Sequence, residues 1–194
     1  MLTSIALIGM PGGGKSSVGR QLARRLGCPF RDTDTIIEER IGEPIRSFFD
    51  REGEPRFRDI EQQVLQGCLD QAGEGVLATG GGIVVREANR RLLSQRAVTI
   101  YLHTPPDELA RRLRHDTHRP MLQVADPRAK LRELYRVRDP LYRETARFVI
   151  ETGRPSVPTL VGMILMQLEL AGLVDPALVP SPVDQTTLFG RRDD

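Results

Sequence analysis

Eight residues near the start of the chain, GMPGGGKS at positions 9–16, have the residue types and the spacing needed to bind a polyphosphate. Gly9, Gly14, Lys15 and Ser16 fit the pattern G-x-x-x-x-G-K-[ST], directly after a short apolar run. Glycines let consecutive backbone N–H groups turn inward around phosphate oxygens, and a helix that begins here adds its positive dipole end. We therefore expect a phosphate-binding loop in which the positive charge of Lys15 lies at the β- and γ-phosphates and the Ser16 hydroxyl ligates Mg²⁺.

Two carboxylates follow the second apolar run, in the sequence RDTDT. Asp32 and Asp34 are two residues apart, so their side chains lie on the same side if the chain stays extended. One carboxylate could then serve hydrated Mg²⁺ while the other faces an acceptor hydroxyl. An aspartate that caps the next helix is the alternative, and it explains one of the two better than both.

Three consecutive glycines, Gly80–Gly82, end the apolar run VLATGGG. Glycines directly after a strand indicate a backbone that approaches a ligand closely. A plain loop explains them equally well when they are taken alone. Their place at the same edge as the phosphate-binding loop favours a substrate contact.

Three arginines could neutralise or bind an anion. Arg58 stands in FRDIE with Glu61 one helical turn later, and a surface ion pair is the default interpretation. Arg119 stands in HRPML, either as a solvated loop charge or as a lid residue that closes on the transferred phosphoryl group. Arg138 belongs to RDPLYRE, late in a helix.

Short apolar runs alternate with longer amphipathic segments, which is typical of an α/β fold with one parallel sheet. Five strands are expected, over Ser4–Ile8, Pro29–Asp32, Gly75–Thr79, Val98–Leu102 and Arg147–Glu151. Helices are expected over Lys15–Leu26, Thr33–Ile41, Pro44–Asp50, Pro55–Ala72, Arg86–Leu93, Pro106–Arg114, Pro127–Ala146 and Val157–Ala171. Because ligands of open parallel sheets bind at the carboxyl ends of the strands, the groups named above should share one edge.

The totals limit the classes of protein that fit. A chain of 194 residues is long enough for one full core, and we expect one domain. A net charge of +2 without a run of like charges gives no support for a nucleic-acid or membrane partner. Cys28 and Cys68 lie far apart and predict reduced, packed thiols. No secretory signal or long apolar span is evident, so a cytoplasmic protein is expected.

The motifs GMPGGGKS, DTDT, FRDIE, TGGG, RPML and RDPLYRE, in this order, resemble those of shikimate kinases over about residues 4–172. The resemblance implies a three-layer α/β sandwich of the P-loop NTPase type with a central five-stranded parallel sheet. It places the kinase domain at residues 1–173 with a lid loop at about 114–125. Residues 174–194, rich in proline and without periodicity, are expected to be a tail of uncertain order.

The same resemblance implies a role for individual residues. The reaction would be transfer of the ATP γ-phosphoryl group to the 3-hydroxyl of shikimate, with Mg²⁺ as cofactor, in a monomer. Catalysis is assigned to Lys15, Asp34 and Arg119, and Mg²⁺ binding to Ser16 and Asp32. ATP binding is assigned to Gly12, Gly13, Gly14, Lys15, Ser16, Ser17, Arg112, Arg119 and Arg154. Shikimate binding is assigned to Asp34, Arg58, Gly80, Gly81, Gly82 and Arg138, with the two arginines on the carboxylate.

Three alternatives remain at this point. Another kinase of the same fold, for gluconate or a nucleoside monophosphate, would share the phosphate-binding loop. A nucleic-acid or regulatory ATPase would require an acidic strand end and a basic surface, and the strand ending in YLHTPPDE has no carboxylate directly at its tip. A hydrolase or metal site would rest on His103, or on His115 and His118, none of which lies near a convincing nucleophile in sequence.

Overall fold

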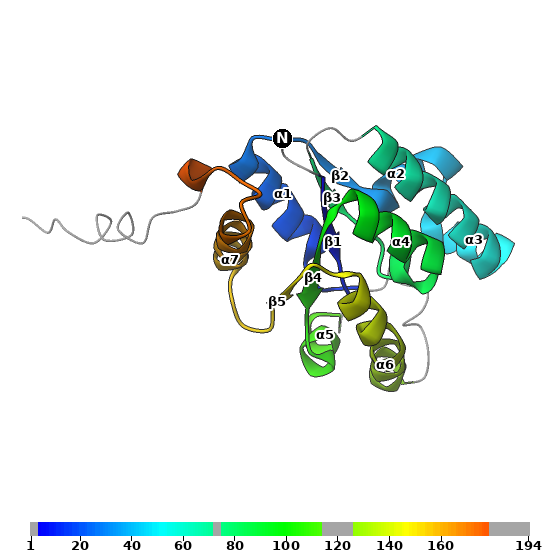
Figure 1. Cartoon of the computed structure of the whole chain (residues 1–194). Helices are drawn as coiled ribbons and strands as arrows, with labels where there is room; N and C mark the ends of the chain where they lie inside the picture. The colour runs from blue at the N-terminus through cyan, green and yellow to red at the C-terminus, as the bar shows by residue number, and fades with distance from the viewer. Residues whose placement is uncertain (1–3, 72–74, 114–125, 179–194) are drawn as a thin grey trace, which may run out of the picture.

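The computed structural model describes residues 4–71, 75–113 and 126–178 (Figure 1). Its strands are β1 (Ile5–Ile8), β2 (Phe30–Asp32), β3 (Val76–Ala78), β4 (Val98–His103) and β5 (Phe148–Glu151). Its α-helices are α1 (Lys15–Leu26), α2 (Thr33–Ile41), α3 (Ile45–Asp70), α4 (Glu87–Arg96), α5 (Pro106–Arg112), α6 (Pro127–Thr145) and α7 (Val157–Leu170). Two short 3₁₀ helices, η1 (Ile83–Val85) and η3 (Pro176–Leu178), complete the described chain.

The five strands form one sheet in the order β2-β3-β1-β4-β5, and every pair is parallel. The registers align Leu7 with both Ala78 and Ile100, so β1, β3 and β4 run level through the centre of the sheet. Parallel pairing brings the carboxyl ends of all five strands to one edge. The segments that follow the strands therefore meet there.

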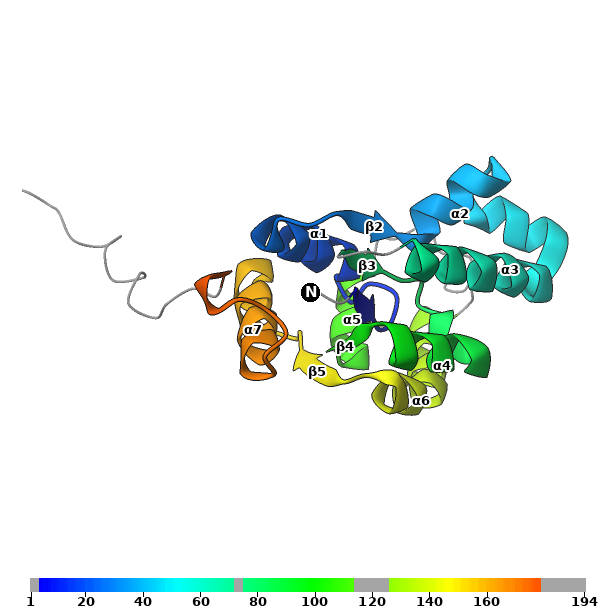
Figure 2. The same cartoon turned by 45° about the horizontal axis from the view of Figure 1, so that its top comes forward.

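Each face of the sheet is covered by its own set of helices. Alternate residues of β1 enter different cores, Ile5 and Leu7 on one side and Ala6 and Ile8 on the other. The core that holds Ile5 and Leu7 is closed by α1 and α7, and the opposite core is closed chiefly by α3, α4 and α6. Figures 1 and 2 show these two groups of helices on opposite sides of the sheet. The predicted three-layer α/β sandwich with five parallel strands is thereby confirmed.

Most predicted elements are present with small changes at their ends. Strand β4 runs one residue further than expected, to His103, and α4 extends to Arg96. The two helices expected on either side of residues 51–54 are both present within α3, where the non-helical backbone of Gly53 separates them by a kink. The helices η1 and η3 were not expected.

The remaining predictions for this level concern thiols, membrane spans and chain ends. Cys68 is buried, Cys28 is half-buried, and both are free thiols. Within the described ranges no helix is long and apolar enough to cross a membrane. Val174 packs into the core beside α7, so ordered chain continues past residue 173. The lid expected at about 114–125 lies outside the described residues.

Candidate active site

The phosphate-binding loop connects β1 to α1 and has the backbone that a polyphosphate requires. Gly12 and Gly14 have φ angles of 81° and 85°, values that side chains with a Cβ rarely adopt. Gly14 is also the residue at which α1 begins, so the free N–H groups of the helix open onto the loop. The Lys15 ammonium is buried and lies 2.9 Å from the carbonyl oxygens of both Gly9 and Met10. A positive charge and a helix N-terminus are thus held at the same place.

The two residues expected to hold Mg²⁺ lie in contact. The Ser16 hydroxyl, in the first turn of α1, donates to Oδ2 of Asp32 at the end of β2, at 2.5 Å. The other oxygen, Oδ1, accepts the Asp34 N–H at 3.1 Å and caps α2. A hydroxyl and a carboxylate beside a phosphate site are donors that Mg²⁺ accepts, because it binds through one or two protein oxygens plus phosphate and water. The residues present therefore fit this ion.

Asp34 lies apart from Asp32, which corrects the expectation that both project to one side of an extended chain. Because α2 begins at Thr33, the chain turns between the two aspartates. Asp32 faces the phosphate-binding loop, whereas Asp34 Oδ1 lies 2.7 Å from the point where Gly80 would carry a Cβ. The two carboxylates consequently serve neighbouring but separate parts of the site.

The turn formed by Gly80, Gly81 and Gly82 is the point on which the site converges. Built Cβ positions on these residues would meet, respectively, Asp34 Oδ1 at 2.7 Å, Pro11 Cδ at 2.6 Å and Arg58 Nη1 at 2.2 Å. No side chain larger than hydrogen fits at Gly82 unless Arg58 moves. The Gly80 N–H donates to Thr33 Oγ1 at 3.0 Å, so this N–H group already has a partner within the protein.

Arg58 is held by a buried ion pair, and the surface pair expected from the sequence is wrong. Its guanidinium donates to Glu61 Oε2 at 2.7 Å, and the two side chains are only 7% and 1% exposed. Nε and Nη2 also donate to Glu54 Oε1, at 3.1 and 3.0 Å. Burial raises the pKa of the Glu61 carboxyl, and Arg58 opposes that shift. Burial lowers the pKa of Arg58 and is the largest single cause, but the charges of Glu61 and Glu54 and the hydrogen bonds to them together outweigh it, so the net direction is upward and the guanidinium stays charged.

Helix α6 supplies Arg138 and a tyrosine that the sequence reasoning missed. Arg138 is buried, and its Nη1 donates to the Gly81 carbonyl at 3.2 Å. Tyr142 lies one helical turn later; its hydroxyl donates to the same carbonyl and lies 3.9 Å from Met10 Sδ. Burial raises the pKa of Tyr142, which keeps its hydroxyl a donor. The spacing of four residues from Arg138 was the signal available in the sequence.

The predicted adenine side is assembled less densely. Arg112, at the end of α5, donates through Nη2 to the Thr152 carbonyl at 2.7 Å, after the end of β5. Arg154 follows two residues later and is exposed, as is Ser17 in the first turn of α1. Leu113, which follows the last residue of α5, lies 2.9 Å from a Cβ built on Gly12. Arg119 lies outside the described residues.

His103 belongs to a structural cluster. Its Nδ1 lies 2.5 Å from Glu151 Oε2 and its Nε2 lies 2.5 Å from the Tyr135 hydroxyl, which occupies both ring nitrogens. Over residues 4–71, 75–113 and 126–178, no group of three or more His, Cys, Asp or Glu side chains could hold a metal ion on its own. His115 and His118 fall outside these ranges.

Comparisons with known proteins identify the family of this chain. The shikimate kinase family model matches residues 11–169. The shikimate kinase of Paracidovorax citrulli is 56% identical over 176 residues, which are 90% of this chain and 96% of that protein. The structure of shikimate kinase from Acinetobacter baumannii in complex with shikimate has a TM-score of 0.85 at 43% identity and covers 90% of this chain and 97% of its own.

A gluconokinase from Sinorhizobium meliloti has a lower TM-score of 0.59 at 22% identity, covering 87% of this chain and 93% of its own, and so shares the fold alone. The family match spans residues 11–169, a range that includes Pro11, Asp34, Arg58, Gly80–Gly82 and Arg138. The high-identity relative covers 90% of the chain. The chain belongs to the shikimate kinase family of phosphotransferases.

Proposed function

We propose that this chain transfers the γ-phosphoryl group of ATP to the 3-hydroxyl of shikimate through the residues that meet at Gly80–Gly82. The observation that carries the proposal is this convergence. Asp34 from α2, Arg58 from α3 and Arg138 from α6 all reach the turn, which also abuts Pro11 of the phosphate-binding loop. A small polyol carboxylate bound at the turn is therefore adjacent to the end of a bound triphosphate.

At the nucleotide end, the backbone N–H groups of Gly12–Gly14 and the N-terminus of α1 bind phosphate oxygens. Lys15 can exchange its two backbone acceptors for β- and γ-phosphate oxygens, because its ammonium already lies within the loop. Ser16 and Asp32 would hold Mg²⁺ directly or through water. Bound there, the ion neutralises phosphate charge during transfer.

At the acceptor end, Arg58 and Arg138 present guanidinium groups to the shikimate carboxylate, whose two oxygens suit planar paired donors. Clamping the carboxylate orients the ring so that one hydroxyl faces Asp34. Asp34 then orients that hydroxyl or accepts its proton while the oxygen attacks in line. Since such transition states are loose, positioning and charge neutralisation contribute more than base strength.

Several finer assignments stay predictions. They are lid catalysis by Arg119, contacts by Arg112 and Arg154 on the adenine side of the ATP site, an ATP contact by Ser17, the monomeric state and the cytoplasmic location.

The proposal is tested by ADP release from the purified protein with Mg·ATP and one acceptor at a time. Shikimate should support turnover, whereas gluconate and AMP should not exceed the rate without acceptor. Turnover with gluconate or AMP instead would contradict the assigned acceptor, and ADP release that is independent of any acceptor would favour an ATPase.

Gly82→Ala is expected to raise the shikimate KM about tenfold or more, because the new methyl group displaces the Arg58 guanidinium and a shift of about 1 Å is costly to a positioned group. Gly67→Ala is the matched control, since nothing lies within 4 Å of a Cβ built there in the interior of α3. The control should keep its KM and gain about 0.5–1 kcal/mol in free energy of unfolding. An unchanged KM in Gly82→Ala would contradict the close approach of Arg58.

Tyr142→Phe is expected to raise the shikimate KM about fivefold with little change in the ATP KM, because it removes one hydrogen bond worth about 1 kcal/mol from the Gly81 carbonyl. Tyr101→Phe is the control: its ring stacks on Tyr142 at 4.9 Å, but its hydroxyl donates to Asp139. Steady-state kinetics of both variants make the comparison. Equal effects in the two would show that Tyr142 supports packing only.

A further inference from the structure

We propose that Arg86 is a positioning residue for shikimate and does not contact shikimate itself. It holds helix α3 against the glycine turn, so that the Arg58 guanidinium stays next to Gly82. The inference rests on the proposed function, since it assigns the carboxylate to Arg58.

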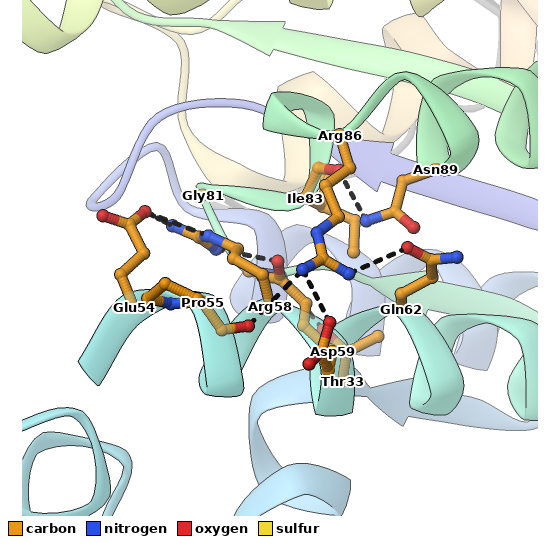
Figure 3. A network of polar contacts seen from close by, with 12 residues as sticks. Thr33, Glu54, Pro55, Arg58, Asp59, Gln62, Gly81, Ile83, Arg86 and Asn89 are labelled. Atoms are coloured by element: carbon orange, nitrogen blue, oxygen red, sulfur yellow. Dashed lines mark hydrogen bonds and ion pairs between the residues drawn. The ribbon is translucent and has the colours of Figure 1, made fainter. Parts of the chain in front are cut away.

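Arg86 lies four residues after the glycine turn and joins this part of the chain to α3 through three hydrogen-bond acceptors (Figure 3). It stands between η1 and α4, and its guanidinium donates to Asp59 Oδ1 at 2.7 Å, Gln62 Oε1 at 3.1 Å and the Pro55 carbonyl at 3.4 Å. Residues 55, 59 and 62 are spaced by four and three, so they lie along one face of the helix. A planar guanidinium can span such a face, whereas an ordinary surface pair uses one partner.

Helix α3 also contacts the glycine turn through its own side chain Arg58. Figure 3 shows both arginines in the region where α3 faces the segment that follows the glycine turn. Arg58 comes from the helix and contacts Gly82, whereas Arg86 comes from the segment four residues after Gly82 and contacts the helix. The two arginines therefore form a reciprocal clasp, with one side in the site and the other outside it.

The short segment between the two contacts is otherwise firmly held. Ile83 and Val84 are fully buried, and the Ile83 carbonyl accepts the Asn89 side chain at 3.0 Å. Arg90 donates to the Val84 carbonyl at 2.9 Å. Because the segment is anchored to the core, Arg86 acts as a fixed point from which α3 is positioned.

The clasp also lies on the relevant side of the break in α3. Pro55 follows the non-helical Gly53 by two residues, so Arg86 is hydrogen-bonded to the part of the helix that carries Arg58. Without the hydrogen bonds of Arg86 to α3, the Arg58 guanidinium keeps Glu61 as its partner but loses its fixed distance to Gly82 and Arg138. Loss of Arg86 should therefore weaken acceptor binding more than nucleotide binding.

The experiment compares Arg86→Ala with Arg91→Ala, measuring shikimate KM, ATP KM, the Kd of shikimate by titration calorimetry, and Tm. Arg91 is the matched control, because it lies on α4, its side chain is 72% exposed, and within the described part of the chain it pairs locally with Glu87. We expect Arg86→Ala to raise the shikimate KM and Kd about tenfold and to leave the ATP KM within about twofold. Arg91→Ala should change neither constant.

Two further variants keep the test decisive if Arg86→Ala folds poorly. Arg86→Lys can pair with Asp59 but cannot span all three acceptors, so its KM should lie between the wild-type value and that of the alanine variant. Asp59→Asn should raise the KM alone and add little to Arg86→Ala, because both remove the same contact.

The outcomes separate this inference from the proposed function. A lower Tm in the Arg86 and Asp59 variants with an unchanged shikimate KM would mean that Arg86 only stabilises the fold, and it would overturn the inference while leaving the function intact. Wild-type protein without shikimate-dependent turnover would overturn the proposed function itself, and this inference with it.

Discussion

Asp34→Asn is expected to lower kcat with shikimate by between about a hundredfold and a thousandfold, the lower part of the range typical for loss of a general base or its equivalent. The amide keeps the size of the side chain beside Gly80 but cannot accept the proton or hold the hydroxyl with a full negative charge. The shikimate KM should change much less, because the carboxylate clamp of Arg58 and Arg138 is intact. Single-turnover and steady-state rates at saturating ATP measure the effect.

Glu39→Gln is the control for this substitution, since it removes one carboxylate from an exposed position on the same helix α2. Its kcat should match that of the wild type. A loss of less than about tenfold in Asp34→Asn would contradict the placement of the reacting hydroxyl at Asp34.

Arg58→Ala should raise the shikimate KM about 150-fold, because two charge-assisted hydrogen bonds to a carboxylate contribute about 3 kcal/mol. The ATP KM should stay within about twofold. The same change leaves Glu61 buried without its cation, so the free energy of unfolding should fall by about 3–5 kcal/mol. Measurements below the Tm of the variant keep the two effects apart.

Arg58→Lys provides a variant that retains the charge next to Glu61 and loses only the planar paired donors. It should recover much of the stability but little of the shikimate affinity. Arg56→Ala, an exposed arginine on the same helix, should alter neither. Equal weakening of shikimate and ATP in Arg58→Ala would show that the acceptor site has been misassigned.

The strands could be predicted almost to the residue because short apolar runs bounded by turn residues have few other uses. Strand β4 runs to His103, one residue past its predicted end. The prediction stopped before His103 because this residue is polar, but in the structure it is buried and contacts Glu151 and Tyr135. The helix pair on either side of Gly53 was predicted as two elements, since Pro55 suits the first turn of a helix. The structure has two helical stretches within α3, separated by a kink at the non-helical Gly53, in agreement with that prediction.

The members of the candidate site could be predicted far better than their depths and directions. The sequence FRDIE identifies Arg58 and Glu61 as an i,i+3 pair, but helical spacing is the same for a surface pair and a buried one. Arg58 is buried because the glycine turn, which is distant in sequence, packs against its guanidinium. The separation of Asp32 from Asp34 likewise depends on where α2 begins, which alternation in a strand cannot reveal. Tyr142 and Arg86 act through contacts to segments that are distant in sequence. For Tyr142 the only local signal is its spacing of four residues from Arg138, and for Arg86 there is none.

The most direct test of the central claim is to identify the product of the wild-type protein incubated with Mg·ATP and shikimate, by mass spectrometry and by ³¹P–¹H coupling in NMR. A carboxylate held by Arg58 and Arg138 with one hydroxyl at Asp34 predicts a single monophosphate, substituted at the 3-hydroxyl, formed in equal amount to ADP. A phosphate on another ring hydroxyl would contradict the orientation at the glycine turn, and ADP without a phosphorylated acceptor would contradict the transfer itself.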